Sequence, residues 1–276
     1  MNDIEVVVIS LPNSVRVQNL INQLSDKFIN FKIINAINGN NTDSQVLNNS
    51  VNKRAALARL GYSMSPSLLA CALSHKLAYE NFLNSNKGWA LIFEEDAKLT
   101  KDFQIDVINQ ITIAKSSHPT IIQLFSRGSR MTALKSWIKV NETYFEFKFL
   151  PRISGFGASA YLINRLAAKI ATDSKLIDGP PDFPSWNINV NFFGIYPWMI
   201  QENEVGSQIE TISLSRFQIW SRRFQIIFGL HYLKFRKYYI SSLSYCKEEI
   251  LPLIYFFMWK IRGSRHFSDK NSPQII

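Results

Sequence analysis

Residues 5–11, Glu-Val-Val-Val-Ile-Ser-Leu, constrain the fold of this chain more than any other segment. The run is β-branched and apolar at neighbouring positions, so a strand built from it buries both of its faces. Such strands are typical of parallel sheets that helices cover on each side. Turn residues 12–14 end the run, apolar residues then recur at helical spacing over 17–24, and a second strand is predicted over 31–37.

The alternation of strands and helices continues through the body of the chain. The predicted helices are a short one over 54–60 within a polar loop, a long one from 66 to 83, and others over 102–115 and 165–171. The predicted strands are 89–93, 120–125 and a stretch ending at 163, with an antiparallel pair within 136–150. The fold class is therefore α/β, a Rossmann-type mixed sheet flanked by helices, which suggests nucleotide binding.

The charge of the chain is unevenly distributed. The formal net charge is +10, and residues 215–276 contribute eleven Lys or Arg against three Asp or Glu. Because the composition shifts near residue 212, we expect one domain over 1–212 and a basic, aromatic, helical extension over 213–276. A basic extension on a near-neutral body indicates an anionic partner for the extension alone.

Large aromatic residues alternate with Lys and Arg over residues 216–239. We interpret this segment first as one that binds an anionic membrane surface, second as one that packs on the body, and only distantly as a nucleic-acid site. The apolar run 250–259 contains Pro252 and is shorter than the roughly 20 residues that a membrane span needs. With no recognisable signal peptide, we expect a cytoplasmic, peripheral membrane protein that binds no nucleic acid.

Three adjacent carboxylates, Glu94-Glu95-Asp96, directly follow the predicted strand 89–93. They repel one another and need a cation, basic partners or solvent. Glu94 and Asp96 are two positions apart, so they should project to one side, where they could hold Mn²⁺ or Mg²⁺ against diphosphate oxygens. A solvated acidic turn is the alternative. The two cysteines, Cys71 and Cys246, indicate neither a disulfide framework nor a metal site, and Cys71 is expected in the core.

Several short motifs occur in order along the chain. They are Leu11 followed by Arg16, the turn Ala36-Ile37-Asn38-Gly39, the helical Cys71-Ala72-Leu73-Ser74-His75, the triplet Glu94-Glu95-Asp96, the Gly-rich stretch 155–163, Asp182 after two prolines, and Pro197 with Gln201 and Ser207. Over residues 5–210 the series resembles glycosyltransferase family 25, the lipooligosaccharide-biosynthesis transferases. Three positions depart from the family pattern: Asn38 and Glu95 stand where it has Asp or another acid, and Leu68 stands where it has Glu.

The resemblance implies a GT-A-type fold that transfers a sugar, most often galactose, from a UDP-sugar with inversion. It also implies a divalent metal, here at Glu94 and Asp96, and a lipid-linked lipooligosaccharide or lipopolysaccharide core acceptor at the inner face of the bacterial inner membrane. The residues that we expect to bind the donor are Arg16, Asn38, Gly39, His75, Glu95 and Gly155. The alternatives are a surface role for Arg16, a structural role for His75, and tight packing for Gly155 and Gly157.

Inversion by direct displacement needs a base that accepts the proton of the acceptor hydroxyl. Asp182, in a loop flanked by prolines, is the expected base, with Glu202 and Glu204 as the other candidates. A turn-capping role is the alternative for Asp182. A nucleotidyltransferase is disfavoured because residues 11–14 contain no glycine, and an oxidoreductase because the chain lacks a G-x-G-x-x-G fingerprint. A non-catalytic membrane- or polyanion-binding protein with a degenerate nucleotide-sugar fold remains the rival.

Overall fold

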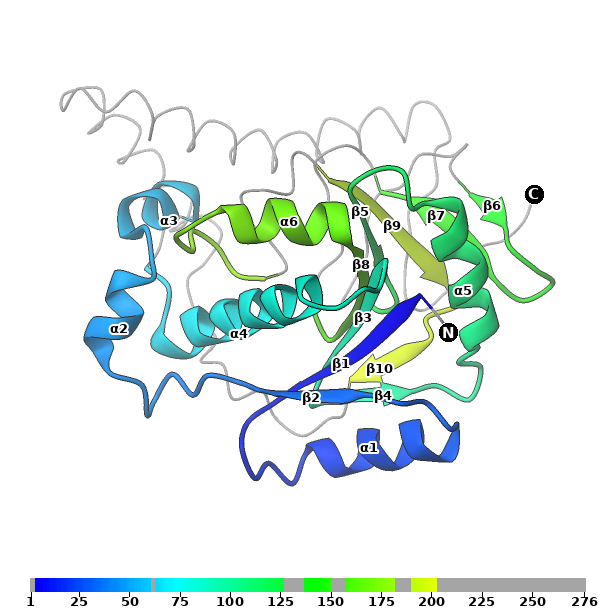
Figure 1. Ribbon diagram of the computed structural model, residues 1–276, viewed down its shortest axis with the longest axis horizontal. Helices are drawn as coiled ribbons and strands as arrows, with labels where there is room; N and C mark the ends of the chain where they lie inside the picture. The colour runs from blue at the N-terminus through cyan, green and yellow to red at the C-terminus, as the bar shows by residue number, and fades with distance from the viewer. Residues whose placement is uncertain (1–2, 61–62, 127–136, 150–156, 182–189, 203–276) are drawn as a thin grey trace, which may run out of the picture.

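The structure is a computed structural model that describes residues 3–60, 63–126, 137–149, 157–181 and 190–202 (Figure 1). These residues form an eight-stranded sheet of order β2-β1-β3-β8-β5-β9-β7-β6 and a two-stranded sheet of β10 and β4. The strands are β1 Ile4–Ser10, β2 Lys32–Asn35, β3 Trp89–Glu94, β4 Ala97–Leu99, β5 Thr120–Gln123, β6 Ile138–Lys139, β7 Phe145–Lys148, β8 Ala160–Asn164, β9 Asn191–Tyr196 and β10 Ile200–Glu202. The helices are α1 Val17–Asp26, α2 Ser44–Asn49, α3 Lys53–Leu60, α4 Pro66–Leu83, α5 Ile105–Ala114 and α6 Arg165–Asp173.

The large sheet is mixed, and its N-terminal strand lies in a parallel part. β1 runs parallel to both β2 and β3, so Val8 pairs with Ile33 on one side and with Phe93 on the other. β8 runs antiparallel between β3 and β5, whereas β5 and β9 are parallel. β7 and β6 continue the sheet in antiparallel fashion. The predicted buried parallel strand and the predicted antiparallel pair are both confirmed.

Helices cover the two faces of the large sheet (Figure 1). Alternate residues of a strand point to opposite faces. Val6 and Val8 of β1 join the core under α1 and α5, whereas Val7 and Ile9 join the core under α4 and α6. Burial of each large apolar side chain in these cores contributes about 1.5–3 kcal/mol to stability. The predicted α/β class, a Rossmann-type mixed sheet flanked by helices, is confirmed.

The structure differs from the sequence prediction in three places, one of which is strand β9, in a segment where no strand was predicted. The polar loop before α4 holds two helices rather than one, because the Asp43 side chain accepts a hydrogen bond from the backbone N–H of Gln45 and starts α2. The short antiparallel pair of β4 and β10 was not predicted either. Strands of three residues are too short to show an alternating pattern.

The long helix α4 begins as predicted. Ser65 Oγ accepts a hydrogen bond of 3.2 Å from the backbone N–H of Leu68, and Pro66 occupies the first helical turn. Within the described ranges, no helix is long and apolar enough to cross a membrane. The extension 213–276 and the domain boundary near residue 212 lie outside the described residues.

Candidate functional site

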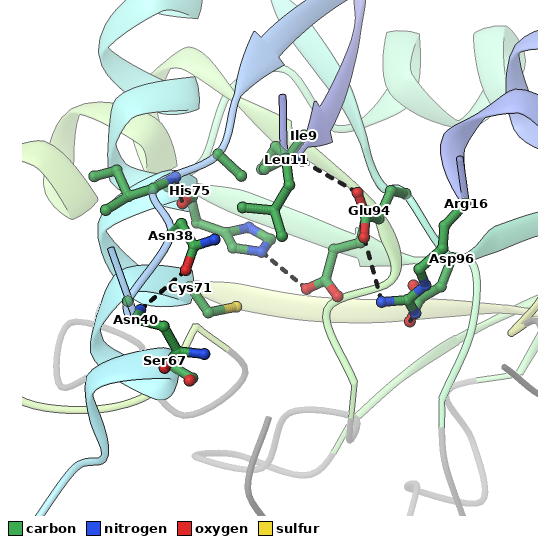
Figure 2. Close-up of a pocket in the computed structure, with 15 residues that line it drawn as sticks. Ile9, Leu11, Arg16, Asn38, Asn40, Ser67, Cys71, His75, Glu94 and Asp96 are labelled. Carbon is green, nitrogen blue, oxygen red and sulfur yellow. Dashed lines mark hydrogen bonds and ion pairs between the residues drawn. The ribbon is translucent and has the colours of Figure 1, made fainter. Parts of the chain in front are cut away.

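A cavity of about 170 Å³ lies where β1, β2 and β3 end (Figure 2). Its wall comes from the end of β1, the turn after β2, the N-terminal half of α4, the acidic turn after β3, and Arg16. Because the three strands are parallel, their carboxyl ends meet at one edge of the sheet, where open α/β sheets bind ligands. The lining residues are Ile9, Leu11, Arg16, Ala36, Ile37, Asn38, Gly39, Asn40, Ser67, Cys71, Ser74, His75, Glu94, Glu95 and Asp96.

Arg16 binds two of the three adjacent carboxylates. Its Nη1 lies 3.2 Å from Glu95 Oε1 and its Nη2 lies 3.2 Å from Asp96 Oδ2. The three side chains are only 13%, 11% and 14% exposed, so these charge-assisted contacts are well shielded from water. Arg16 is therefore no surface arginine. One guanidinium facing three carboxylates still leaves the cavity wall with excess negative charge.

Glu95 connects the acidic turn to the end of β1. Its Oε2 accepts hydrogen bonds from Ser10 Oγ at 3.0 Å and from the backbone N–H of Leu11 at 3.1 Å. Together with the Arg16 contact, these bonds engage both of its carboxylate oxygens. Glu95 thus holds the acidic turn against β1 and orients its neighbours at the cavity. Its predicted contact with a donor stays a prediction.

Glu94 contacts His75 of α4 whereas Asp96 contacts Arg16, yet both carboxylates line the same cavity (Figure 2). Its Oε1 lies 2.9 Å from His75 Nε2, and the other ring nitrogen, Nδ1, lies 2.7 Å from the hydroxyl of Tyr161. Tyr161 in turn shares a hydrogen bond of 2.7 Å with the hydroxyl of Tyr79. Burial raises the pKa of Tyr161 well above its ordinary value and also raises the pKa of Tyr79, so both hydroxyls stay protonated.

This buried chain of side chains was not predicted from the sequence. Apart from Tyr161 and the terminal Asn164, the residues of strand β8 are small or aliphatic. The hydroxyl of Tyr161 among them was the only sequence signal for this chain of hydrogen bonds. His75 is buried yet lines the cavity, which agrees with both roles that its sequence context left open. Cys71 was expected in the core. It is instead half-buried and lines the cavity, because the start of α4 extends past the sheet edge.

The turn after β2 closes the cavity opposite the acidic turn. Asn38 Oδ1 accepts a hydrogen bond of 2.9 Å from the backbone N–H of Asn40, which tightens the turn. A Cβ at Gly39 would lie 2.5 Å from the carbonyl oxygen of Pro66, so only glycine lets the turn approach α4 this closely. Asn38 and Gly39 thus line the cavity at the carboxyl edge of the sheet, and their contact with a donor stays a prediction.

Of the candidate bases, the structure describes Glu202 alone. Asp182, Glu204 and the predicted donor-binding Gly155 lie outside the described residues. Glu202 pairs with Ala97 in the small sheet, directly after the acidic turn, and its carboxylate accepts a hydrogen bond from Ser159 Oγ. The carbonyl of Ser159 accepts from the backbone N–H of Glu94 at 2.9 Å, so Glu202 lies beside the acidic turn.

The sequence model of glycosyltransferase family 25, described as an LPS biosynthesis protein, matches residues 3–175. The match covers more than half of the chain and includes every residue that lines the cavity. The chain belongs to glycosyltransferase family 25. This family 25 protein is therefore a glycosyltransferase of lipopolysaccharide biosynthesis.

Two solved structures are similar to the family 25 protein at low identity. The crystal structure of A197 from STIV aligns with a TM-score of 0.38 and 13% identity, over 77% of this chain and 99% of that chain. The inositol-1-phosphate CTP transferase from T. maritima aligns with a TM-score of 0.34 and 11% identity, over 82% of this chain and 98% of that chain. Neither likeness is high enough to inform the activity. No curated protein matches the chain significantly.

Proposed function

We propose that this family 25 transferase moves a sugar, most simply galactose, from a UDP-sugar to a lipooligosaccharide or lipopolysaccharide core acceptor with inversion. The observation that carries the proposal is the acidic turn on the cavity wall, held in place by Arg16 and by the end of β1. A diphosphate is anionic, so a cavity with three carboxylates and one guanidinium would repel it unless a cation lies between them. A UDP-sugar with a divalent metal meets that requirement.

Glu94 and Asp96 are the residues that would hold Mn²⁺ or Mg²⁺. Both line the cavity, and carboxylate oxygens are the ligands that these hard cations prefer. A metal bound there supplies positive charge that offsets the charge developing on the UDP leaving group. Arg16, through its contact with Asp96, keeps that carboxylate in place at the cavity.

Asp182 is the proposed base that accepts the proton of the acceptor hydroxyl. The alternative bases are Glu204 and Glu202. Glu202 stays a candidate because it lies beside the acidic turn. Direct displacement with inversion needs only one such group. Arg16, Asn38, Gly39, His75, Glu95 and Gly155 are the proposed donor-binding residues.

We propose that the protein acts at the cytoplasmic face of the inner membrane, where a lipid-linked acceptor would lie. The basic, aromatic extension 213–276 would bind anionic lipid there, with cations at the headgroups and aromatic rings at the boundary. Vesicles that contain anionic lipid should retain the full chain and release a 1–212 truncation. If the vesicles retain the full chain and the truncation equally, the extension has no role in membrane binding.

A donor-binding titration tests the proposal without an acceptor. UDP should bind the full chain more tightly with Mn²⁺ than after metal removal with EDTA, and Asp96→Ala should abolish that difference. Glu142→Ala is the matched control, because its side chain is 94% exposed and lies on a distant hairpin. Metal-independent binding that survives Asp96→Ala would contradict the proposed role of the acidic turn.

A further inference from the structure

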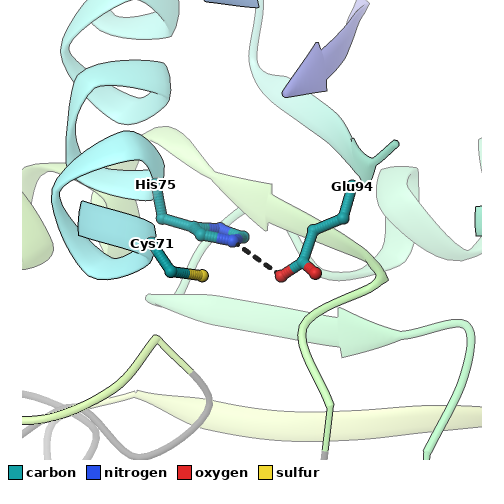
Figure 3. Close-up of side chains that lie close together, drawn as sticks. All are labelled: Cys71, His75 and Glu94. Carbon is teal, nitrogen blue, oxygen red and sulfur yellow. Dashed lines mark hydrogen bonds and ion pairs between the residues drawn. The ribbon is translucent and has the colours of Figure 1, made fainter. Parts of the chain in front are cut away.

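Three side chains of different chemistry converge at the α4 side of the cavity (Figure 3). Cys71 and His75 are four residues apart on α4, so they lie on one face of the helix, and Glu94 approaches them from the end of β3. The Cys71 Sγ, a ring nitrogen of His75 and a carboxylate oxygen of Glu94 all lie within 4.8 Å of one another. We propose that Cys71, His75 and Glu94 form a site for one divalent cation of the zinc type.

The orientation of His75 supports this assignment. Histidines that bind metals generally use their second ring nitrogen in a hydrogen bond that fixes the ring. Here Tyr161 engages Nδ1 at 2.7 Å, which directs Nε2 toward Glu94 and the cluster. When Nε2 binds a cation, its proton moves to Nδ1, Nδ1–H donates to Tyr161, and the Tyr161 hydroxyl donates to Tyr79. In this arrangement Tyr161 keeps its hydrogen bonds with both His75 and Tyr79.

The distance between His75 and Glu94 suits a small cation. His75 Nε2 and Glu94 Oε1 are 2.9 Å apart, and a zinc ion bonds nitrogen and carboxylate oxygen at about 2.0–2.2 Å. A cation between them therefore replaces their hydrogen bond with a movement of a few tenths of an ångström. Cys71 binds as the thiolate, so its thiol proton passes to solvent when the cation enters.

The chemistry of the three ligands selects the cation. A thiolate and an imidazole favour Zn²⁺ or Co²⁺, whereas Mg²⁺ and Mn²⁺ favour oxygen ligands. Three protein ligands would leave a fourth position for another ligand, and all three residues line the cavity. If the chain binds a UDP-sugar as proposed above, a diphosphate oxygen is a suitable occupant of that position. Glu94 belongs both to this site and to the proposed Mn²⁺ or Mg²⁺ site with Asp96. Substitution of Cys71 therefore tests the first site alone, and substitution of Asp96 tests the second alone.

Metal stoichiometry tests the site on the full chain without any donor. After EDTA treatment and dialysis against Zn²⁺, elemental analysis should find one equivalent per chain. Cys71→Ser and His75→Gln should each weaken zinc binding by at least roughly tenfold. Cys246→Ser and His118→Gln, the latter at an exposed histidine, are the matched controls and should retain the ion. The separate variant Asp96→Ala should retain it too. Full zinc binding in Cys71→Ser would overturn the proposal.

A second measurement uses the unmutated chain, so it does not depend on the folding of a variant. Zn²⁺ should protect Cys71 from alkylation in peptide mapping by mass spectrometry, while Cys246 keeps its reactivity. Cobalt should give a thiolate charge-transfer absorption that persists in Cys246→Ser. Equal alkylation of Cys71 with and without zinc would overturn the proposal. Because neither measurement needs a UDP-sugar, failure here leaves the proposed transfer reaction to its own tests.

Discussion

Arg16 and Glu95 lie 79 positions apart in the sequence, yet Arg16 Nη1 and Glu95 Oε1 are 3.2 Å apart at the cavity. The same carboxylate accepts hydrogen bonds from Ser10 and Leu11 at the end of β1. One ion pair therefore connects the residue before α1, the end of β1 and the acidic turn after β3. The position of Asp96, which Arg16 also contacts, depends on that connection.

Arg16→Lys should weaken both the fold and the proposed donor site. A lysine presents a single point charge and does not bridge two carboxylates as a guanidinium does. We expect a loss of about 1–3 kcal/mol in the free energy of unfolding, measured by urea denaturation, together with a lower affinity for UDP. Lys139→Ala removes the cation of an exposed pair with Glu142 and should cost less than about 1 kcal/mol. Equal effects of the two substitutions would contradict the role given to Arg16.

Tyr161→Phe should leave the buried Nδ1 of His75 without its hydroxyl partner. The expected loss is about 1–3 kcal/mol in the free energy of unfolding, because a buried polar group loses its hydrogen bond. Turnover should also fall, since His75 then orients Glu94 less well. Tyr144→Phe is the matched control: Tyr144 is also buried, and its hydroxyl donates to the carbonyl of Asp102, away from the cavity. Tyr144→Phe should lower stability and leave turnover per folded molecule unchanged. An equal fall in turnover in both variants would refute the positioning role of Tyr161.

Gly39→Ala should disturb the cavity more than Gly88→Ala does. At Gly39 the new methyl group would lie 2.5 Å from the backbone oxygen of Pro66, so the turn or α4 has to move, at a cost of about 1–3 kcal/mol. At Gly88 the close atom belongs to the side chain of Asp3, which can rotate away. Thermal unfolding and UDP affinity of both variants check this prediction. Unchanged thermal unfolding and UDP affinity in Gly39→Ala would contradict the close approach of the turn to α4.

Asp182→Asn and Glu202→Gln separate the candidate bases. Loss of a general base lowers turnover by roughly 10²–10⁴-fold without a matching loss of donor binding. We expect that result for Asp182→Asn, and only a modest change for Glu202→Gln, whose hydrogen bond with Ser159 gives it a structural partner. The opposite pattern would assign the base to Glu202. The measurement is the steady-state rate of transfer to a core acceptor, with UDP affinity determined in parallel.

The sequence predicts most of the sheet because its signals are local and strong. A continuous apolar run marks β1 and β3 as buried strands, and Ser65-Pro66 marks the start of α4. The acidic triplet after β3 is equally visible, and its place at the carboxyl edge follows from the parallel pairing. These features need no knowledge of distant contacts.

The arrangement of the side chains at the cavity depends on contacts between distant segments. No local pattern shows that Arg16 turns toward Glu95 and Asp96 while Glu94 turns toward His75. The two-residue spacing predicted that Glu94 and Asp96 share one side. In the structure both line the cavity, but their nearest partners lie on different elements, because β3 ends at Glu94 and the chain bends there. Tertiary partners, rather than strand alternation, set those orientations.

Release of UDP from a panel of UDP-sugars tests the central claim most directly. The full chain, Asp96→Ala and the control Glu142→Ala would be assayed with Mn²⁺ and with EDTA, each with and without a core acceptor. We predict metal-dependent UDP release from one donor, stimulated by acceptor, lost in Asp96→Ala and retained in Glu142→Ala. UDP release that is the same in Asp96→Ala as in the unmutated chain, or no release from any donor even with acceptor present, would contradict the account.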